Sequence, residues 1–277
     1  NNSAGATSAV LNAKDGVDVT IDVSAATGSS KAFKLVGGTG KDTLKGGAGA
    51  DIITGGNDVD TIDGGGAIDT ISGGSGNDII TGGAGADIIT IDGDTDTVKD
   101  LGGASGTDSD VVIIKAGASL NATDIKGFTA TSATQNNSTD ATKAVLNAID
   151  GSNVTITVAS ATGSSKAFKL VGGTGQDSLT GGAGADIILG NNANDTLKGN
   201  AGNDVLTGGA GDDELHGGND NDTFNISAGS DTIKDLATGD VVVITGGSVV
   251  AEDVVAFNAT SATKNTGGTF EIKAKST

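Results

Sequence analysis

The sequence predicts an all-β protein whose fold class is a parallel β-roll, or β-solenoid, in two tandem copies with β-rich flanking segments. Three observations carry this prediction: aspartates recur every nine residues, an apolar residue stands two positions after each of them, and glycine-rich tetrads precede most of them. Self-similarity at a fixed short period is typical of solenoids, in which each repeat stacks on its neighbours. A flexible Gly/Asp-rich tract would explain the glycines. It would not explain the apolar residue, which keeps the same position in all fourteen nonapeptide repeats, each called a word below.

The aspartates form two runs of seven, each on a strict nine-residue grid. They are Asp42, Asp51, Asp60, Asp69, Asp78, Asp87 and Asp96 in the first run, and Asp177, Asp186, Asp195, Asp204, Asp213, Asp222 and Asp231 in the second. The consensus of the words is G-G-x-G-x-D-x-U-x, where U is apolar, and GGAGADIIT at 46–54 and 82–90 is a clear example. Glycines accept positive φ and allow a tight turn, while D-x-U-x is a short strand with U facing inward. Two words therefore make one coil.

The chemistry of these turns predicts bound calcium. Ca²⁺ is a hard cation that takes about six to eight oxygen ligands, and stacked turns offer both Asp carboxylates and backbone carbonyls. Only three of the 35 acidic residues are Glu, so the shorter carboxylate dominates where the side chain must reach back into its own turn. A column of like charges repels itself without a counterion. We therefore expect several Ca²⁺ ions per array and poor folding without them.

The words resemble those of the RTX (repeats-in-toxin) calcium-binding β-roll family over residues 37–101 and 172–236, about half of the chain. Each array also ends in a way similar to RTX arrays, with the pattern D-x-U-x-D-U at 96–101 and 231–236. In that family the Asp of each word and carbonyls of the glycine turn bind calcium between one repeat and the repeat two further on. The resemblance implies that all fourteen aspartates are metal ligands and that each array holds about five full sites.

Several words depart from the pattern at their glycines. The fourth glycine is replaced by Asp58, Asp220, Ala67 and Ala193, and the word at 199–204 loses its second glycine. Asn and Asp tolerate the left-handed backbone region, whereas an alanine is strained there by about 1–2 kcal/mol. The turns of Ala67 and Ala193 are therefore the predicted weak points for calcium.

A larger repeat contains the small ones. SSKAFKLVGGTG occurs at 29–40 and again at 164–175, and the offset of 135 also aligns residues 1–23 with 136–158. We expect two β-roll units, 1–135 and 136–277, with calcium arrays at 37–101 and 172–236. Alternating apolar residues at 17–23 and 154–158 predict lead-in strands, and Leu35 and Leu170 already lie on the nine-residue grid. Strands are also predicted at 110–114, 240–244 and 269–275, and a short helical turn at 122–128 and 251–257.

Composition argues against several functions. The net charge is −19 and there is no arginine, so nucleic acid is not an expected partner. No apolar run is long enough to span a bilayer, so membrane insertion is not expected. Without cysteine there is no disulfide or thiol chemistry. The single histidine, His216, is expected on an exposed strand position, and no serine stands in G-x-S-x-G. We expect no catalytic residue and no enzyme.

Resemblance to RTX surface-layer proteins and large repeat adhesins implies a calcium-dependent structural protein of the bacterial cell exterior. It implies self-assembly into a surface layer, filament or matrix, with other copies of the chain as partners and a cell-surface glycan as a candidate anchor. Export by a type I system is also implied, and the opening residues NNSAGATSAV do not resemble a signal peptide.

Two alternatives stay open. One is a stalk or binding segment of a large adhesin, and the other is the carrier segment of a type I-secreted enzyme or toxin. Ice binding is not expected, because the outward turn positions, such as Thr39/Lys41 and Ala48/Ala50, form no Thr-x-Asn ladder.

Overall fold

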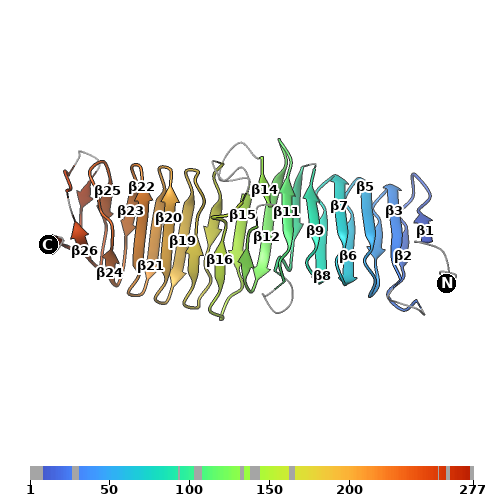
Figure 1. Ribbon diagram of the computed structural model, residues 1–277, viewed down its shortest axis with the longest axis horizontal. Helices are drawn as coiled ribbons and strands as arrows, with labels where there is room; N and C mark the ends of the chain where they lie inside the picture. Colours follow the sequence, from blue (N-terminus) through green and yellow to red (C-terminus); the bar gives the residue numbers. More distant parts are fainter. Residues whose placement is uncertain are drawn as a thin grey trace. The chain divides into compact units, whose positions relative to one another are not determined.

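The computed structural model describes residues 9–26, 31–92, 94–102, 108–131, 134–137, 144–161, 166–254, 256–259 and 263–274. These residues form parallel strands and turns without any helix, which confirms the all-β parallel β-roll. None of them forms a helix that could cross a membrane. The chain divides into two compact units, Asn1–Thr139 and Asp140–Thr277. Figure 1 draws each unit as a ladder of short strands joined by tight turns. The boundary after residue 135 stays a prediction.

The first unit contains two rows of parallel strands, and the chain alternates between them. One row runs in the order β1 (Ala9–Asn12), β3 (Phe33–Thr39), β5 (Ile52–Asn57), β7 (Thr70–Ser75), β9 (Ile88–Ile91), β11 (Val111–Ile114) and β14 (Gln135–Asn136). The other row contains β2 (Thr20–Asp22), β4 (Thr43–Lys45), β6 (Thr61–Gly66), β8 (Ile79–Ala84), β10 (Thr95–Val98) and β12 (Ser119–Ile125). A short strand β13 (Phe128–Thr129) follows.

The second unit repeats this arrangement. One row contains β15 (Ala144–Ala148), β17 (Lys169–Val171), β19 (Ile187–Asn192), β21 (Val205–Ala210), β23 (Thr223–Ile226), β25 (Val241–Ile244) and β27 (Lys264–Asn265). The other contains β16 (Thr155–Thr157), β18 (Ser178–Thr180), β20 (Thr196–Ala201), β22 (Glu214–Asn219), β24 (Ser230–Ile233), β26 (Ser248–Val254) and β28 (Thr269–Ala274).

Register follows from the nine-residue period. Strands pair with the strand one coil away, 18 residues along the chain, so that Leu35 pairs with Ile53 and Ile53 with Ile71. Every U residue therefore lies above another U residue, and each is at most about 1% exposed. In the second unit Leu170, Ile188 and Leu206 form the corresponding column. These stacked side chains are the core, and their burial is the main apolar contribution to folding.

The solenoid begins before the first glycine turn, as predicted. In the first unit β1 pairs with β3 and β2 with β4, and in the second β15 pairs with β17 and β16 with β18. The predicted strands after the arrays are β11 and β25, and the predicted final strand is β28.

The predicted helical turns at 122–128 and 251–257 are wrong. Residues 119–125 form β12, whose N-terminal half pairs with β10, and residues 248–254 form β26, which pairs with β24 and β28. The coil below supplies partners for the backbone N–H and C=O groups, so stacking overrides the local preference. Asp124 (φ 60°) and Asp253 (φ 54°) are left-handed in these strands, and the register of β26 shifts between Ala251 and Val254.

Array turns that lack a glycine still take the left-handed conformation. The residues concerned are Asp58 (φ 70°), Ala67 (φ 69°), Asn191 (φ 79°), Ala193 (φ 72°), Asn200 (φ 81°) and Asp220 (φ 77°). The stacked coils therefore impose the glycine geometry at these six positions. At Ala67 and Ala193 the imposed conformation is strained, since alanine has no polar side chain to compensate.

We expect Ala67→Gly and Ala193→Gly each to raise the free energy of unfolding by about 1 kcal/mol, because glycine adopts this conformation without strain. Urea unfolding in saturating calcium measures the change. Ala48→Gly is the matched control, because Ala48 is exposed in a glycine turn and is not left-handed. That variant should lose about 0.5–1 kcal/mol through the entropy of the unfolded chain. Stabilisation by all three substitutions would contradict the strain argument.

Candidate calcium sites

All fourteen array aspartates are buried, at no more than about 3% exposure. The structure brings them together as columns, because each lies directly before the inward-facing strand and the strands stack. One carboxylate oxygen of each aspartate accepts a hydrogen bond from the main chain one coil earlier. The Asp42 N–H donates to Asp60 Oδ1 at 2.8 Å, and the Asp186 N–H donates to Asp204 Oδ1 at 2.7 Å. These bonds set the position of the columns.

The second carboxylate oxygen has no hydrogen-bond partner in eleven of the fourteen words. These atoms are the Oδ2 of Asp42, Asp60, Asp69, Asp78, Asp87, Asp96, Asp195, Asp204, Asp213, Asp222 and Asp231. An unpaired buried carboxylate oxygen is costly in free energy unless a cation or proton compensates it. The columns therefore contain a regular series of buried anionic oxygens with coordination capacity left over.

A carbonyl oxygen borders the same space as the orphaned oxygen in five of the words, those of Asp42, Asp60, Asp69, Asp195 and Asp204. A side chain on Gly55 would collide with Asp60 Oδ2 and with the carbonyl oxygen of Gly73, which belongs to the repeat two further on. Gly199 stands in the same relation to Asp204 Oδ2 and the Gly217 carbonyl. The first glycine of the word thus leaves open a cradle of carboxylate and carbonyl oxygens. Oxygens of these two kinds are the ligands that Ca²⁺ takes in proteins.

Each cradle depends on backbone carbonyls as well as on carboxylates. Within the parts of the chain that the structure describes, no three acidic or histidine side chains gather as a metal-binding group. A calcium ion would supply the positive charge that the columns lack, held by array aspartates and turn carbonyls of coils two repeats apart.

Burial raises the pKa of most array aspartates in the metal-free chain. The pKa is raised to about 6 for Asp60 and Asp186, to about 7 for Asp69, Asp96, Asp195, Asp222 and Asp231, and to about 8 for Asp204. Desolvation is the largest cause. Backbone N–H donors lower the pKa, and in most cases neighbouring aspartates raise it further.

Four further aspartates close the columns, and the sequence analysis did not assign them. Asp110 Oδ1 accepts from the Asp87 N–H and its Oδ2 from the Gly102 N–H; Asp240 accepts from Asp222 and Ala237 in the same way. Asp100 accepts from the Gly82 and Gly83 N–H groups, and Asp235 from those of Gly217 and Gly218. Asp240 lies on the nine-residue grid, and the two D-x-U-x-D-U endings contain Asp100 and Asp235. These carboxylates have both oxygens satisfied by peptides, so they end the arrays without needing an ion.

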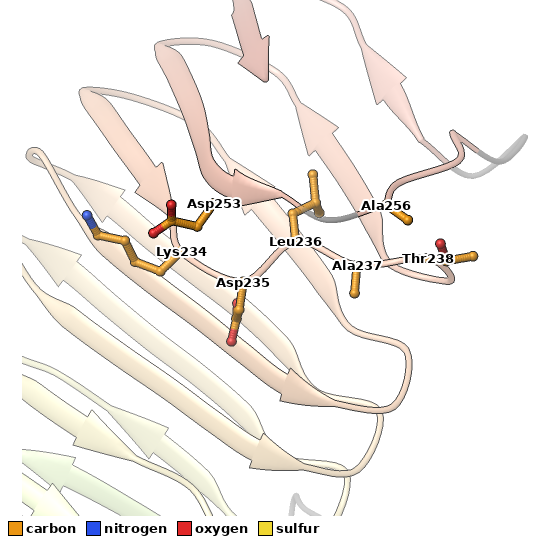
Figure 2. Close-up of a pocket in the computed structure, with 7 residues that line it drawn as sticks. All are labelled: Lys234, Asp235, Leu236, Ala237, Thr238, Asp253 and Ala256. Carbon is orange, nitrogen blue, oxygen red and sulfur yellow. The ribbon is translucent and has the colours of Figure 1, made fainter. Parts of the chain in front are cut away.

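Asp235 is the more accessible of these caps. It lies beside an open cavity of about 520 Å³ lined by Lys234, Asp235, Leu236, Ala237, Thr238, Asp253 and Ala256. Figure 2 shows the Asp235 and Leu236 side chains on opposite sides of the chain. Leu236 is buried, while the Asp235 carboxylate is bound to the two glycine N–H groups at 2.9 Å each.

We expect Asp235→Ala to lower the free energy of unfolding by about 1–3 kcal/mol, because it leaves two peptide donors without their acceptor. Urea unfolding in saturating calcium measures the loss, and amide exchange at Gly217 and Gly218 should accelerate. Asp94→Ala removes the same charge from an exposed position and should change stability by less than about 0.5 kcal/mol. Equal effects of the two substitutions would show that net charge, not the peptide bonds, is responsible.

His216 lies on β22 and its side chain is partly exposed, 2.8 Å from Glu214 Oε1. Lys234 pairs with Glu252 at 2.7 Å on the neighbouring strands. This histidine therefore lies beside a cross-strand row of ion pairs formed by Glu214, Lys234 and Glu252 on the outer face of the second unit.

A parallel solenoid with a buried aspartate column behind glycine turns belongs to the class of β-rolls whose coils are held together by metal ions. The family model of the RTX calcium-binding nonapeptide repeat (4 copies) matches residues 36–71, 63–98, 169–197, 189–224 and 198–233. The two arrays are therefore RTX calcium-binding nonapeptide repeats, and they bind calcium at multiple sites. A comparison with curated proteins found no match.

Proposed function

We propose that this protein is a calcium-dependent structural protein of the bacterial cell exterior that self-assembles into a surface layer, filament or matrix. The carrying observation is the pair of arrays in which eleven buried carboxylate oxygens have no hydrogen-bond partner among the residues that the structure describes. The fourteen array aspartates are the proposed ligands, with the carbonyls of the glycine turns. Such repeats are structural calcium-binding segments, and no catalytic role is proposed for them.

An extracellular location agrees with this chemistry. RTX repeat proteins are typically secreted, and extracellular calcium modules have dissociation constants of about 10⁻⁴–10⁻³ M. Cytosolic calcium lies far below that range, so the chain would stay unfolded before export and fold outside. This behaviour suits type I secretion, in which an unfolded chain leaves the cell.

Self-assembly is supported by the geometry of stacked parallel strands. A solenoid ends in sheet edges, whose N–H and C=O groups pair readily with another strand. The proposed partners are other copies of this chain, with a cell-surface glycan as anchor.

Electron microscopy of the purified protein with and without about 1–10 mM calcium tests the assembly proposal, together with light scattering for mass. Ordered sheets or fibres that appear with calcium and dissolve on chelation are the expected result. A protein that folds in calcium but stays monomeric over the whole range would overturn self-assembly and favour the adhesin stalk. The carrier segment of a secreted enzyme would then be distinguished by a catalytic domain in the same gene product.

A further inference from the structure

Three array turns differ from the others in the direction of one peptide. The second glycine of the word donates its N–H to the aspartate of the same word: Gly47 to Asp51 at 2.8 Å, Gly173 to Asp177 at 2.7 Å, and Gly182 to Asp186 at 2.6 Å. These three aspartates are the ones whose Oδ2 is not orphaned. We call these turns capped, and the turns with an orphaned Oδ2 open.

The backbone separates the two kinds of turn. In nine of the eleven open turns the second residue of the word is left-handed: Gly38, Gly56, Gly65, Gly74, Gly83, Asn191, Asn200, Gly209 and Gly218. Gly47, Gly173 and Gly182 are not left-handed. Capped and open turns therefore differ by rotation of the peptide that joins the two glycines.

The amino-acid sequence of the word does not decide between the two states. The hexapeptide GGAGAD is capped at 46–51 and 181–186 but open at 82–87. The tetrad GGTG is open at 37–40 and capped at 172–175. One word with two conformations is a bistable turn, and its surroundings choose the state.

All three capped turns lie in the first coil of an array. The Oδ1 atoms of Asp51, Asp177 and Asp186 accept from Phe33, Val154 and Phe168, where a later coil has another aspartate. An ion there would lack the carboxylate of the preceding coil. The first coils contain a fourth aspartate, Asp42, and its turn is open. Beside this turn the Asp15 carboxylate of the lead-in segment lies close to Gly38.

In the second array, two asparagines hold the capped state from the other side of the peptide. The Asn191 side-chain amide donates to the Gly172 carbonyl oxygen at 2.6 Å, and that of Asn200 donates to the Gly181 carbonyl oxygen at 2.8 Å. The Gly172–Gly173 and Gly181–Gly182 peptides thus have both their C=O and N–H groups satisfied. Each asparagine stands where the pattern has its second glycine.

We propose that each glycine turn is a two-state latch and that the capped turns of Asp51, Asp177 and Asp186 take up calcium last. Binding there must break an N–H bond to the carboxylate and rotate a peptide. In the second array Asn191 and Asn200 are positioning residues that keep the first coil capped and independent of calcium. This proposal rests on the array aspartates being the calcium ligands.

Substitution of aspartates in the same hexapeptide tests the latch. Asp186→Asn should leave the number of tightly bound ions unchanged, whereas Asp87→Asn, in the open copy of GGAGAD, should remove about one or two. Asn200→Gly should open the turn and add tight binding that Asp186→Asn then abolishes. Equilibrium dialysis with labelled calcium counts the ions, and circular dichroism in saturating calcium shows that each variant folds.

Amide resonances provide a second measurement on the unmodified protein. Once the protein has folded in calcium, further titration should shift the amides of Gly47, Gly173 and Gly182 at about tenfold higher free calcium than those of Gly65 and Gly209. The latch is overturned if these amides shift together or if Asp186→Asn loses as many ions as Asp87→Asn. If the unmodified protein and every variant bind no calcium, the assignment of the aspartates as ligands fails as well.

Discussion

Removal of calcium at about pH 7.5 is expected to unfold both arrays, with loss of the β-sheet circular dichroism signal and of the cooperative thermal transition. Eleven buried carboxylate oxygens have no hydrogen-bond partner in the described parts of the chain, and they lie in columns one coil apart. Without a counterion each array contains like charges that are buried away from water. The free-energy cost of burying these charges must then be offset by the apolar core.

The expected magnitude is complete unfolding rather than a small shift. An ion present at a hundred times its dissociation constant stabilises the fold by about 2.7 kcal/mol per site. About five such sites in one array give about 13 kcal/mol, which is comparable with the total stability of an ordinary domain, about 5–15 kcal/mol. Adding calcium back should restore the signal.

Magnesium is the matched control for this experiment. It is smaller, requires near-octahedral geometry and keeps its water ligands, so it should not restore the fold at the same concentration. A protein whose melting curve is the same with chelator and with calcium would refute the role of the columns.

Acidification is expected to restore folding in the absence of calcium, because protons can neutralise the same carboxylates. The folded-state pKa of the buried aspartates is raised above the ordinary value of 3.8, to about 7 for Asp69 and about 8 for Asp204. A raised pKa means that the folded state binds protons more tightly than the unfolded state. The resulting stability is fully present below about pH 4 and is lost as the pH rises through about 6–8.

Circular dichroism from about pH 4 to pH 8, after calcium is removed on a chelating resin, measures this transition. The signal should fall as the pH rises, while calcium affinity should increase over the same range as protons leave the ligands. Asp204→Asn should strengthen the calcium-free fold near pH 7.5 and weaken calcium binding, whereas Glu271→Gln, at an exposed position outside the arrays, should do neither. Calcium-free protein that gains structure as the pH rises would contradict the argument.

Most of the fold could be predicted from the nine-residue period of the sequence. It predicted the parallel coils, the columns of U residues that include Leu35 and Ile53, and the aspartates that the structure buries behind the turns. These features were predictable because one coil is two words. The nine-residue spacing along the chain therefore also fixes which residues stack on one another in successive coils. Outside the arrays the spacing is irregular, and there the prediction of helical turns failed at β12 and β26.

The closing aspartates show where the pattern alone was insufficient. Asp235 was visible as part of D-x-U-x-D-U, but its role depends on the Gly217 and Gly218 N–H groups 17 and 18 residues away. The motif D-x-U-x-D-U does not show that the Gly217 and Gly218 N–H groups lack a partner on a neighbouring strand. That fact arises only where the chain leaves the stack.

The amino-acid sequence by itself determined the repeat, the inward apolar column and the carboxylate chemistry, since each depends on residue type and spacing. Only the tertiary structure decided which copies of GGAGAD are capped and which are open. The physical reason is that both peptide orientations are accessible to a Gly-Gly pair, so the preceding coil makes the choice. The turns of Asp51 and Asp186 follow a coil that presents Phe33 or Phe168, and they are capped, whereas the turns that follow a coil with an array aspartate are open.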